Sequence, residues 1–495
     1  MNHKPTKEQE RIFLFTKKRY ENLLINARAG CGKTTTIVEA IKYLPKDKNI
    51  MFLAFNKHIQ EELKTKLPEY VRCYTTYGLG NAAIKRKYGD KIIFDEFKVD
   101  KIILKKSKTW GLNKEFDDKE EIDFYLSSLK KIINLCRLTL TTKSDYIPYL
   151  IDRHEITNLN ESNDIKRILK VLDAITTDRK SYDYTDMVYL PAIDNSIWMF
   201  PQDYVILDEG QDINLAQQRI IEKTLKRDKF SGKIIGRLII VADKFQSIYG
   251  FNGVTDKTFE WFEKFPNTKA LPLTVSFRCA KNIILKANEI VPDIKALDNA
   301  PDGIVRDGDV LNEAESGDFV LCRTTMPLVK LFFQFLVQHK KAIIKGSDIG
   351  IHLIELIGKI NNIEKLIQFW ENELSIFAKD LKSKGVLNPD EHSGYVALAD
   401  KVMTLLFLAK LSNSIADLKD KIRTIFTDEI QGIVLSTVHK IKGLEANRVF
   451  IIRPDLLPLP NARSWQYQQE KNLEYVAITR SRLELIYDRV WTDEE

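Results

Sequence analysis

A nine-residue segment, ARAGCGKTT at residues 27–35, constrains the fold more than any other part of the sequence. An apolar run at residues 23–26 precedes it, and a helical pattern over residues 34–44 follows it. Small residues between a strand and a helix let backbone N–H groups approach phosphate oxygens, and the helix N-terminus adds positive potential. This order of elements predicts a phosphate-binding loop in a parallel α/β sheet.

The residue types in this loop fit a nucleoside triphosphate with Mg²⁺. Lys33 is long enough to reach the β- and γ-phosphates, and the Thr34 hydroxyl is suited to the metal ion. The positions expected to contact the nucleotide are Ala27, Gly30, Gly32, Lys33, Thr34 and Thr35. Ala27 stands where the usual pattern has glycine, and a chance glycine-rich turn is the alternative interpretation.

A pair of carboxylates follows a second apolar run. Residues 205–212 read VILDEGQD, so Asp208 and Glu209 would emerge at the C-terminal end of a strand, where α/β sheets bind ligands. Asp208 would hold Mg²⁺, and Glu209 would polarise the attacking water. Taken alone, the pair is equally compatible with a surface turn; together with the phosphate loop it favours nucleotide hydrolysis.

Further strands and helices continue the α/β pattern along the chain. Strand signals occur at residues 50–55, 204–207, 237–242, 319–322, 433–436 and 449–452. Lysine-rich helical segments dominate from Gly80 to Tyr182, and residues 346–428 are mostly helical. A second α/β unit is expected to begin near Lys269.

Composition excludes several classes of protein. The chain has 495 residues, 44% of them hydrophobic, and a net charge of +7, which permits a polyanionic partner without requiring one. Because the N-terminus is polar, we expect no signal peptide, and we expect no membrane span because the apolar runs are too short. The five cysteines are scattered, which favours reduced thiols and a cytosolic location.

Four more segments complete an ordered set of motifs. They are VADKFQSIYGFNG at 241–253, LTVSFRC at 273–279, LSTVHKIKGLE at 435–445 and NLEYVAITRSR at 472–482. With the phosphate loop and DEGQD they resemble the motifs of UvrD/Rep/PcrA-like superfamily 1 DNA helicases. The segments FLAFNKHIQEELKTKLP and YTTYG are most similar in sequence to the F-box DNA helicase branch, although no F-box is expected before them.

The resemblance implies two RecA-like lobes with parallel sheets, each with a mainly helical insertion, and ATP bound between the lobes. The implied first lobe comprises residues 1–79 and 181–264, interrupted by an insertion at 80–180. The implied second lobe comprises 265–345 and 429–495, interrupted by a smaller insertion at 346–428. No C-terminal nuclease is expected, because the chain ends shortly after the last motif.

The resemblance also implies roles for residues around ATP. Gln9 and Phe277 would contact the adenine, and Glu445 the ribose. Gln246 would sense the γ-phosphate. Arg278 and Arg480 would be arginine fingers from the second lobe, a role that suits guanidinium groups because phosphoryl transfer builds charge on the phosphate oxygens. A surface salt bridge is the alternative for each arginine.

A track for single-stranded DNA is implied as well. Its expected residues are Asn56, Lys57, Thr76, Tyr77, Tyr249, Phe251, Asn252, Thr437 and His439. Aromatic rings would stack on bases without reading their sequence. Asn252 stands where the family usually has arginine, which removes a phosphate contact. A core aromatic is the alternative for Phe251, and a satisfied histidine in a turn is the alternative for His439.

Lysines of the first insertion, among them Lys85, Lys87, Lys105, Lys106 and Lys108, would face either duplex DNA or solvent.

The resemblance thus predicts an ATP- and Mg²⁺-dependent DNA helicase that moves 3′→5′ on single-stranded DNA and opens duplex junctions. We expect a monomer with no membrane association, in the cytoplasm of a bacterial or phage-infected cell or in a eukaryotic nucleus. A DNA-stimulated ATPase that remodels protein–DNA complexes, or a binding scaffold without processive unwinding, is the alternative, and an RNA-directed motor is a third possibility.

Overall fold

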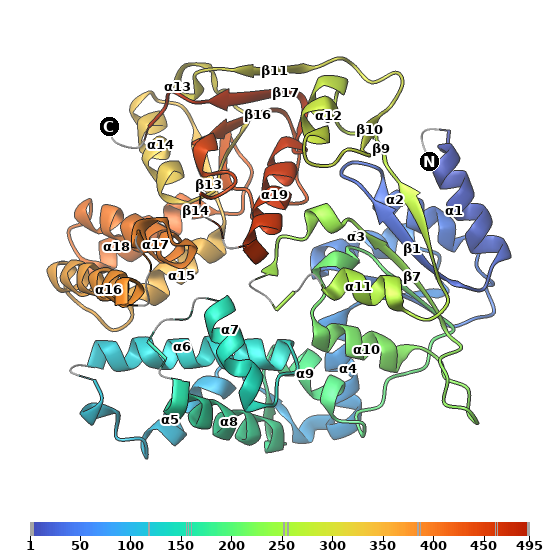
Figure 1. Ribbon diagram of the computed structural model, residues 1–495, viewed down its shortest axis with the longest axis horizontal. Helices are drawn as coiled ribbons and strands as arrows, with labels where there is room; N and C mark the ends of the chain where they lie inside the picture. The colour runs from blue at the N-terminus through green and yellow to red at the C-terminus, as the bar shows by residue number, and fades with distance from the viewer. Residues whose placement is uncertain are drawn as a thin grey trace. The chain divides into compact units, whose positions relative to one another are not determined.

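The structure is a computed structural model that describes residues 4–116, 119–154, 156, 158–159, 161–250, 253–254, 257–383, 386, 388–460, 462 and 464–492. The chain divides into two compact units, which Figure 1 shows together. The first consists of Met1–Ala27 with Gly32–Thr274, and the second of Arg28–Cys31 with Val275–Glu495. Each contains a parallel sheet and helices, which confirms the predicted α/β class.

Six parallel strands form the sheet of the first unit, in the order β3-β2-β6-β7-β1-β8. Strands β2, β6 and β7 are buried along their whole length, as expected of near-continuous apolar runs in a parallel sheet. The strands are β1(Asn22–Ala27), β2(Ile50–Ala54), β3(Val71–Thr75), β6(Tyr204–Leu207), β7(Arg237–Ala242) and β8(Thr268–Leu273). The predicted strands at residues 204–207 and 237–242 therefore coincide with β6 and β7.

The position of the edge strand β8 shows that the second unit starts later in the sequence than predicted. Lys269 lies in β8 and pairs with Leu23 of β1, so this strand completes the first sheet. The first unit consequently runs to Thr274, beyond the boundary expected at residue 264. Half of β8 faces solvent, and this weak apolar signal did not reveal which sheet the strand joins.

Seven helices lie with the first sheet: α1(Lys7–Lys18), α2(Lys33–Ile41), α3(Lys57–Lys66), α4(Thr76–Tyr88), α9(Asp186–Ile193), α10(Leu215–Thr224) and α11(Lys257–Lys264). Polar caps set several of their first turns. Thr6 and Gln9 form a capping box on α1, and Asn214 and Gln217 form another on α10.

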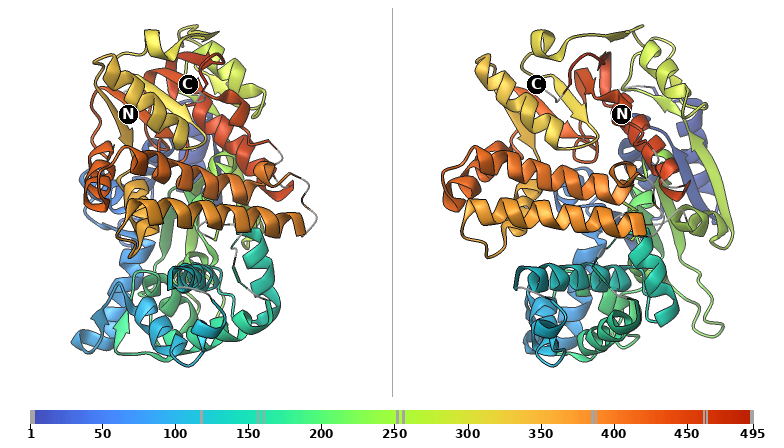
Figure 2. Two further views of the ribbon diagram at one scale, coloured as in Figure 1. Left: turned by 90° about the vertical axis from the view of Figure 1, so that its left-hand side faces the viewer. Right: turned by 60° about the vertical axis from the view of Figure 1, so that its left-hand side comes forward.

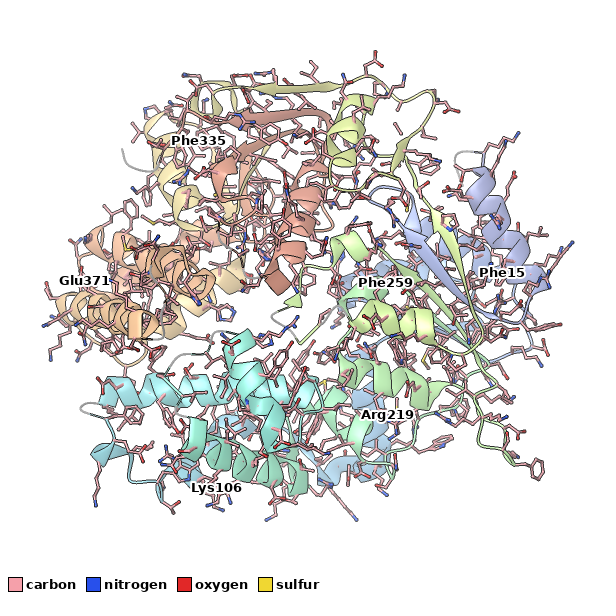
Figure 3. The ribbon with its side chains drawn as sticks, in the orientation of Figure 1. Phe15, Lys106, Arg219, Phe259, Phe335 and Glu371 are labelled. Atoms are coloured by element: carbon pink, nitrogen blue, oxygen red, sulfur yellow. The ribbon has the colours of Figure 1, made fainter. Side chains whose placement is uncertain are left out.

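The first insertion is a helical subdomain with its own core. It contains β4(Ile93–Phe94), α5(Lys98–Ser107), α6(Lys119–Leu138), α7(Ile147–Arg153), α8(Glu161–Thr177) and β5(Ser181–Tyr182). Apolar side chains from α5, α6 and α8, such as Ile103, Ile132 and Ile168, pack together. Lys106 lies exposed on α5, at the outer surface of the subdomain (Figure 3).

The second unit has a seven-stranded parallel sheet in the order β11-β17-β16-β12-β15-β13-β14. Its strands are β11(Ile304–Asp307), β12(Phe319–Cys322), β13(Ala342–Lys345), β14(Phe426–Thr427), β15(Ile433–Thr437), β16(Ala446–Ile452) and β17(Ser481–Asp488), and β9(Val275–Ser276) pairs with β10(Lys295–Ala296). The helices α12(Lys281–Asn288), α13(Val310–Glu313), α14(Met326–Val337) and α19(Ser464–Ile478) accompany this sheet.

The described residues of the second insertion form the helices α15(Ser347–Ile357), α16(Ile363–Ser383), α17(Ser393–Lys410) and α18(Ile415–Ile425). Helices α16 and α17 run side by side, as the views in Figure 2 show. Asp400 of α17 accepts hydrogen bonds from the backbone N–H groups of Thr325 and Met326, at 2.8 Å each, and so ties the insertion to the start of α14.

A buried charge cluster joins the first insertion to helix α9 of its unit. Asp186 lies 2.7 Å from the Lys98 ammonium and 2.8 Å from the Arg137 guanidinium, and none of the three side chains is accessible to solvent to any real extent. Asp183 forms a second pair with Arg137. Burial disfavours the charged form of Arg137, but Asp186 and Asp183 outweigh it and raise the pKa of the guanidinium.

We predict that Asp186→Ala destabilises the first unit by about 3–5 kcal/mol, because it leaves two buried cations without their shared carboxylate. The midpoint of urea unfolding, followed by circular dichroism, measures the loss. Glu260→Ala removes an exposed ion pair with Lys264 in the same unit and should cost less than about 1 kcal/mol. Equal unfolding midpoints for the two variants would show that the charge cluster does not stabilise the first unit.

Candidate functional site

The phosphate loop has the backbone that its glycines predict. Strand β1 ends at Ala27 and helix α2 begins at Lys33. Gly30 and Gly32 between them adopt left-handed conformations, with φ of +70° and +74°, which residues with a Cβ adopt only under strain. Gly32 is also the N-cap of α2, so the loop presents the start of a helix where an anion would bind.

Lys33 forms an ion pair with Glu209. Its ammonium nitrogen lies 2.7 Å from Oε1 and 2.8 Å from Oε2 of the carboxylate, and both side chains are mostly buried. Burial disfavours the charged lysine, but the carboxylates of Glu209, Asp243 and Asp208 outweigh this effect and raise the pKa of Lys33. The lysine is therefore firmly cationic, as phosphate binding requires.

Asp208 contacts the neighbouring residue of the loop. The Thr34 hydroxyl donates a hydrogen bond of 2.8 Å to Oδ2 of Asp208. Burial and the adjacent Glu209 raise the pKa of Asp208 to about 6. One hydroxyl and one carboxylate side by side are the hard oxygen donors that Mg²⁺ prefers, so these two residues fit the expected metal ligands.

Gln211, which sequence analysis did not single out, connects the acidic segment to the next motif. Its amide nitrogen donates to Glu209 at 2.5 Å, and its amide oxygen accepts from the backbone N–H of Asp243 at 3.0 Å. Glu209 itself has φ of +51°, a left-handed conformation that costs a non-glycine residue about 1–3 kcal/mol. The buried Gln in DEGQD was the available signal, because it lies only two residues after Glu209.

Two further candidates for the nucleotide lie in the same unit. Gln246 is buried in a 3-10 turn after β7, and its backbone N–H donates to the carbonyl of Asp243. Gln9 caps α1 through its amide oxygen, and its amide nitrogen donates to the Thr36 hydroxyl of α2 at 2.9 Å. Gln9 is thereby fixed directly beside the helix that follows the phosphate loop.

The expected DNA residues of the first unit fall into an exposed group and a buried group. Asn56 caps α3, and Asn56 and Lys57 are exposed. Thr76 is buried, and its hydroxyl accepts from Gln217 at 2.6 Å. Tyr77 is stacked on Tyr184 with ring centroids 4.5 Å apart.

Phe55 forms an aromatic pair with Tyr249. The two rings are stacked with centroids 5.9 Å apart, and Phe55 is 38% exposed. Phe55 follows directly after β2 and was missed by sequence analysis, although it precedes Asn56 in FLAFNK. Phe251 and Asn252 lie outside the described residues.

In the second unit, Glu445 contacts two arginines. Its carboxylate pairs with the guanidinium of Arg278 and lies 2.5 Å from that of Arg482. Burial disfavours the charged carboxylate, but Arg278 and Arg482 outweigh this and lower the pKa of Glu445. The Arg278 guanidinium also donates to the Thr479 carbonyl at 3.1 Å. Phe277, which precedes Arg278, is partly buried.

Arg480 is buried and donates to backbone carbonyls. Its Nε bonds the Val476 carbonyl at 2.9 Å, and a terminal nitrogen bonds the Leu444 carbonyl at 3.1 Å. Burial and the positive charge of Arg278 lower the pKa of Arg480 to about 9.

Thr437 and His439 lie at the C-terminal end of β15. Thr437 is the last residue of the strand and pairs with Cys322 of β12. Burial and the nearby Arg323 lower the pKa of His439 well below its ordinary value, so it is neutral at pH 7. Arg323, which directly follows Cys322, forms a bidentate pair with Glu470 at 2.7 and 2.9 Å.

Comparison with known proteins places the chain in a family. Residues 6–267 match the UvrD/REP helicase N-terminal domain, and residues 333–488 match the UvrD-like helicase C-terminal domain. The chain belongs to the UvrD/Rep helicase family. The resemblance that the six motifs predicted is therefore confirmed.

Relatives of this UvrD/Rep-family chain include eukaryotic and bacterial helicases. It is 26% identical to the F-box DNA helicase protein 1 of Schizosaccharomyces pombe, over 97% of this chain and 57% of that protein. It is 25% identical to the F-box DNA helicase 1 of Gallus gallus, over 97% and 48%. It is also 26% identical to the ATP-dependent DNA helicase UvrD1 of Mycobacterium tuberculosis, over 54% and 37%. The chain thus spans about half the length of the F-box relatives.

Within the described part of the chain, every helix is too short or too polar to cross a membrane.

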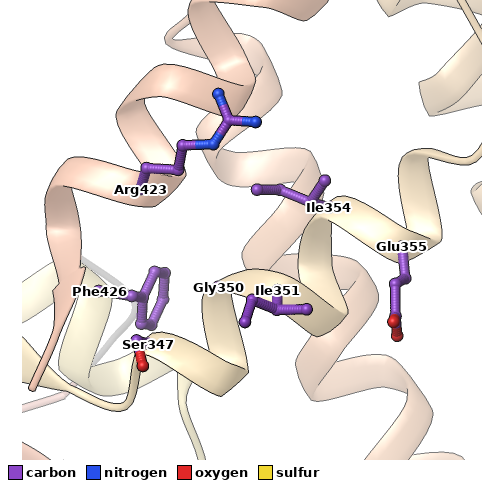
Figure 4. A pocket seen from close by; sticks show the side chains of 7 residues that line it. All are labelled: Ser347, Gly350, Ile351, Ile354, Glu355, Arg423 and Phe426. Atoms are coloured by element: carbon purple, nitrogen blue, oxygen red, sulfur yellow. The ribbon is translucent and has the colours of Figure 1, made fainter. Parts of the chain in front are cut away.

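A pocket of about 370 Å³ lies in the second insertion between α15 and α18 (Figure 4). The side chains that line it include Ile351, Ile354, Phe426, Arg423 and Glu355, and none of the expected nucleotide or DNA residues is among its lining residues.

Proposed function

We propose that this chain is an ATP-dependent DNA helicase that moves 3′→5′ on single-stranded DNA and separates the duplex ahead of it. The observation that supports this most directly is the arrangement of Lys33, Glu209, Thr34 and Asp208 around a glycine loop, in a chain of the UvrD/Rep family. Relatives that match nearly the whole chain are named DNA helicases.

In the proposed reaction, Lys33 exchanges Glu209 for the β- and γ-phosphates of ATP. This frees the Glu209 carboxylate, which Gln211 holds in place, to accept a proton from the attacking water. Thr34 and Asp208 would hold Mg²⁺, which would supply charge stabilisation at the phosphates. Gly30 and Gly32 let the loop N–H groups approach the phosphates, with Ala27 and Thr35 flanking them.

The family motifs suggest roles for further residues, most of them in the second unit. Arg278 and Arg480 stabilise the charge that develops on the transferred phosphoryl group. Glu445 is proposed to contact the ribose, Phe277 and Gln9 the adenine, and Gln246 the γ-phosphate. In the structure, Arg278 is paired with Glu445.

We predict that Lys33→Ala lowers DNA-stimulated ATPase activity by at least about 10³-fold, because Lys33 is the proposed cation of the phosphate loop that holds the β- and γ-phosphates. A coupled ATPase assay measures the rate. Lys42→Ala, which removes an exposed lysine just after α2, is the control and should leave the rate within twofold. A Lys33→Ala rate of half the wild-type value would overturn the site.

The proposed DNA track crosses the C-terminal ends of the strands. Phe55 and Tyr249 offer stacked rings to bases, and Asn56 and Lys57 lie exposed beside them. Thr437 and His439, at the C-terminal end of β15, are the proposed DNA contacts of the second unit. Thr76 and Tyr77 act through their buried contacts by fixing the start of α4, and Phe251 and Asn252 are assigned to the track from the motif alone.

We predict that Phe55→Ala weakens single-stranded DNA binding by about 1–3 kcal/mol, the range for loss of one stacked base. Fluorescence anisotropy with an oligothymidine measures affinity, and DNA-free ATPase activity should stay at the wild-type level. Phe97→Ala removes an exposed phenylalanine of the first insertion and is the matched control. Equal affinities for both variants would exclude Phe55 from the track.

The direction of movement rests on the third and fifth motifs, QSIYGFNG and TVHKIKGLE, which resemble those of the 3′→5′ group. We therefore predict that the protein unwinds a partial duplex with a 3′ tail, given ATP and Mg²⁺, and not one with a 5′ tail. Strand separation followed by fluorescence measures both. Unwinding of the 5′-tailed substrate alone would overturn the direction, and ATPase stimulation without unwinding of either would favour a remodelling role.

A further inference from the structure

Four exposed side chains of the first unit form an arginine–aromatic ladder. The guanidinium of Arg86 lies 5.7 Å from the centre of the Trp198 ring, and that of Arg72 lies 5.0 Å from the centre of the Phe200 ring. Trp198 and Phe200 contact each other edge to face at 5.6 Å. The order is therefore Arg86, Trp198, Phe200, Arg72, with the two cations at the ends.

The ladder is held in place although it faces solvent. Trp198 is 53% exposed and Phe200 is 37% exposed. A guanidinium N–H of Arg86 donates to the Trp198 carbonyl at 3.1 Å, which fixes the indole relative to α4. Ordered, exposed aromatic rings are costly to keep in water, and they often mark a binding surface.

The two arginines of the ladder bring positive charge to this surface. Two neighbouring carboxylates are already paired: Asp203 with Lys226 at 2.7 Å, and Asp194 with Arg179 at 3.5 Å. Within the described residues, neither Arg72 nor Arg86 has a carboxylate partner. Apart from the Arg86 N–H that donates to the Trp198 carbonyl, the guanidinium groups of these two exposed arginines can donate to an external anion.

A basic hairpin at residues 226–236 extends this surface. Its base is joined to the ladder segment, because the Lys226 N–H donates to the Gln202 carbonyl at 2.9 Å. Its turn is fixed by Asp228, which accepts from the Ser231 N–H at 2.8 Å. Phe230 at the turn is 99% exposed, and the hairpin has four basic residues against one aspartate.

The ladder lies at the opposite edge of the first sheet from the proposed ATP and DNA residues. Arg72 lies near the start of β3, and Phe200 precedes the start of β6. Asp208 and Asn56, by contrast, follow the ends of β6 and β2. In a parallel sheet, strand starts and strand ends lie at opposite edges, so the ladder is separate from the proposed track.

We infer that the ladder is a second binding site for single-stranded DNA. Bases stack on exposed aromatic rings whatever their sequence, and arginines bind phosphates through N–H groups that point away from the ring they stack on. An acidic protein would also meet positive charge here, but two exposed rings between two guanidinium ions provide both a stacking surface for bases and cations for phosphates, as single-stranded DNA requires. The site would hold a second strand while the motor holds the first.

The test is photocrosslinking of the full chain to an oligothymidine of about 16 nucleotides that contains 5-iodouracil, followed by mass mapping. Crosslinks at Trp198 or Phe200 are expected. The double variant Arg72→Glu/Arg86→Glu should lose them and reduce the binding of a second oligonucleotide at least about 10-fold. Its ATPase activity with one short oligonucleotide should remain within twofold of wild type, which also shows that it folds.

Arg423→Glu, a charge reversal on an exposed arginine of the second insertion, is the control and should keep the crosslinks. Absence of crosslinks at the ladder in the wild type, or their persistence in the double variant, would overturn the inference. A duplex probe that crosslinks more strongly than the single strand would also overturn the single-strand assignment. Crosslinks at Trp198 in a protein without ATPase activity would sustain this site while refuting the proposed function.

Discussion

The ion pair between Lys33 and Glu209 is the interaction on which the proposed chemistry depends. The two residues are 176 positions apart in sequence, yet their charged groups lie 2.7 Å apart. The parallel sheet makes this possible, because β1 and β6 end at the same edge with β7 between them. In the proposed reaction, phosphate oxygens replace the carboxylate as the partner of the lysine ammonium. Next to this ion pair, the Thr34 hydroxyl donates a hydrogen bond to Asp208.

Much of this arrangement was predictable because its signals are local. The phosphate loop, the strands β6 and β7 and the carboxylates after β6 each follow from short stretches of sequence. The contacts that needed the fold are those between distant residues. Asp186 meets Lys98 across 88 positions, and the Phe55 and Tyr249 rings meet only because β2 and the turn after β7 end at one edge. Strand β8 was misplaced because its partner β1 lies far away in sequence.

The two edges of the first sheet differ in chemistry. One edge combines a glycine loop, carboxylates and a partly exposed aromatic pair, as nucleotide and DNA contacts require. The opposite edge has the arginine–aromatic ladder and the basic hairpin. A single parallel sheet can therefore present two separate surfaces of different chemistry, because its strand starts and strand ends are held apart by the length of the strands.

The most direct test of the central claim is the steady-state rate of ATP hydrolysis by the wild-type protein, measured with Mg²⁺ in the presence and absence of single-stranded DNA. If the site hydrolyses ATP and is coupled to a DNA track, saturating DNA should raise the rate by at least about tenfold, since it adds about 1.4 kcal/mol or more of transition-state stabilisation. A rate that is the same with and without DNA, or no hydrolysis in either condition, would contradict the account.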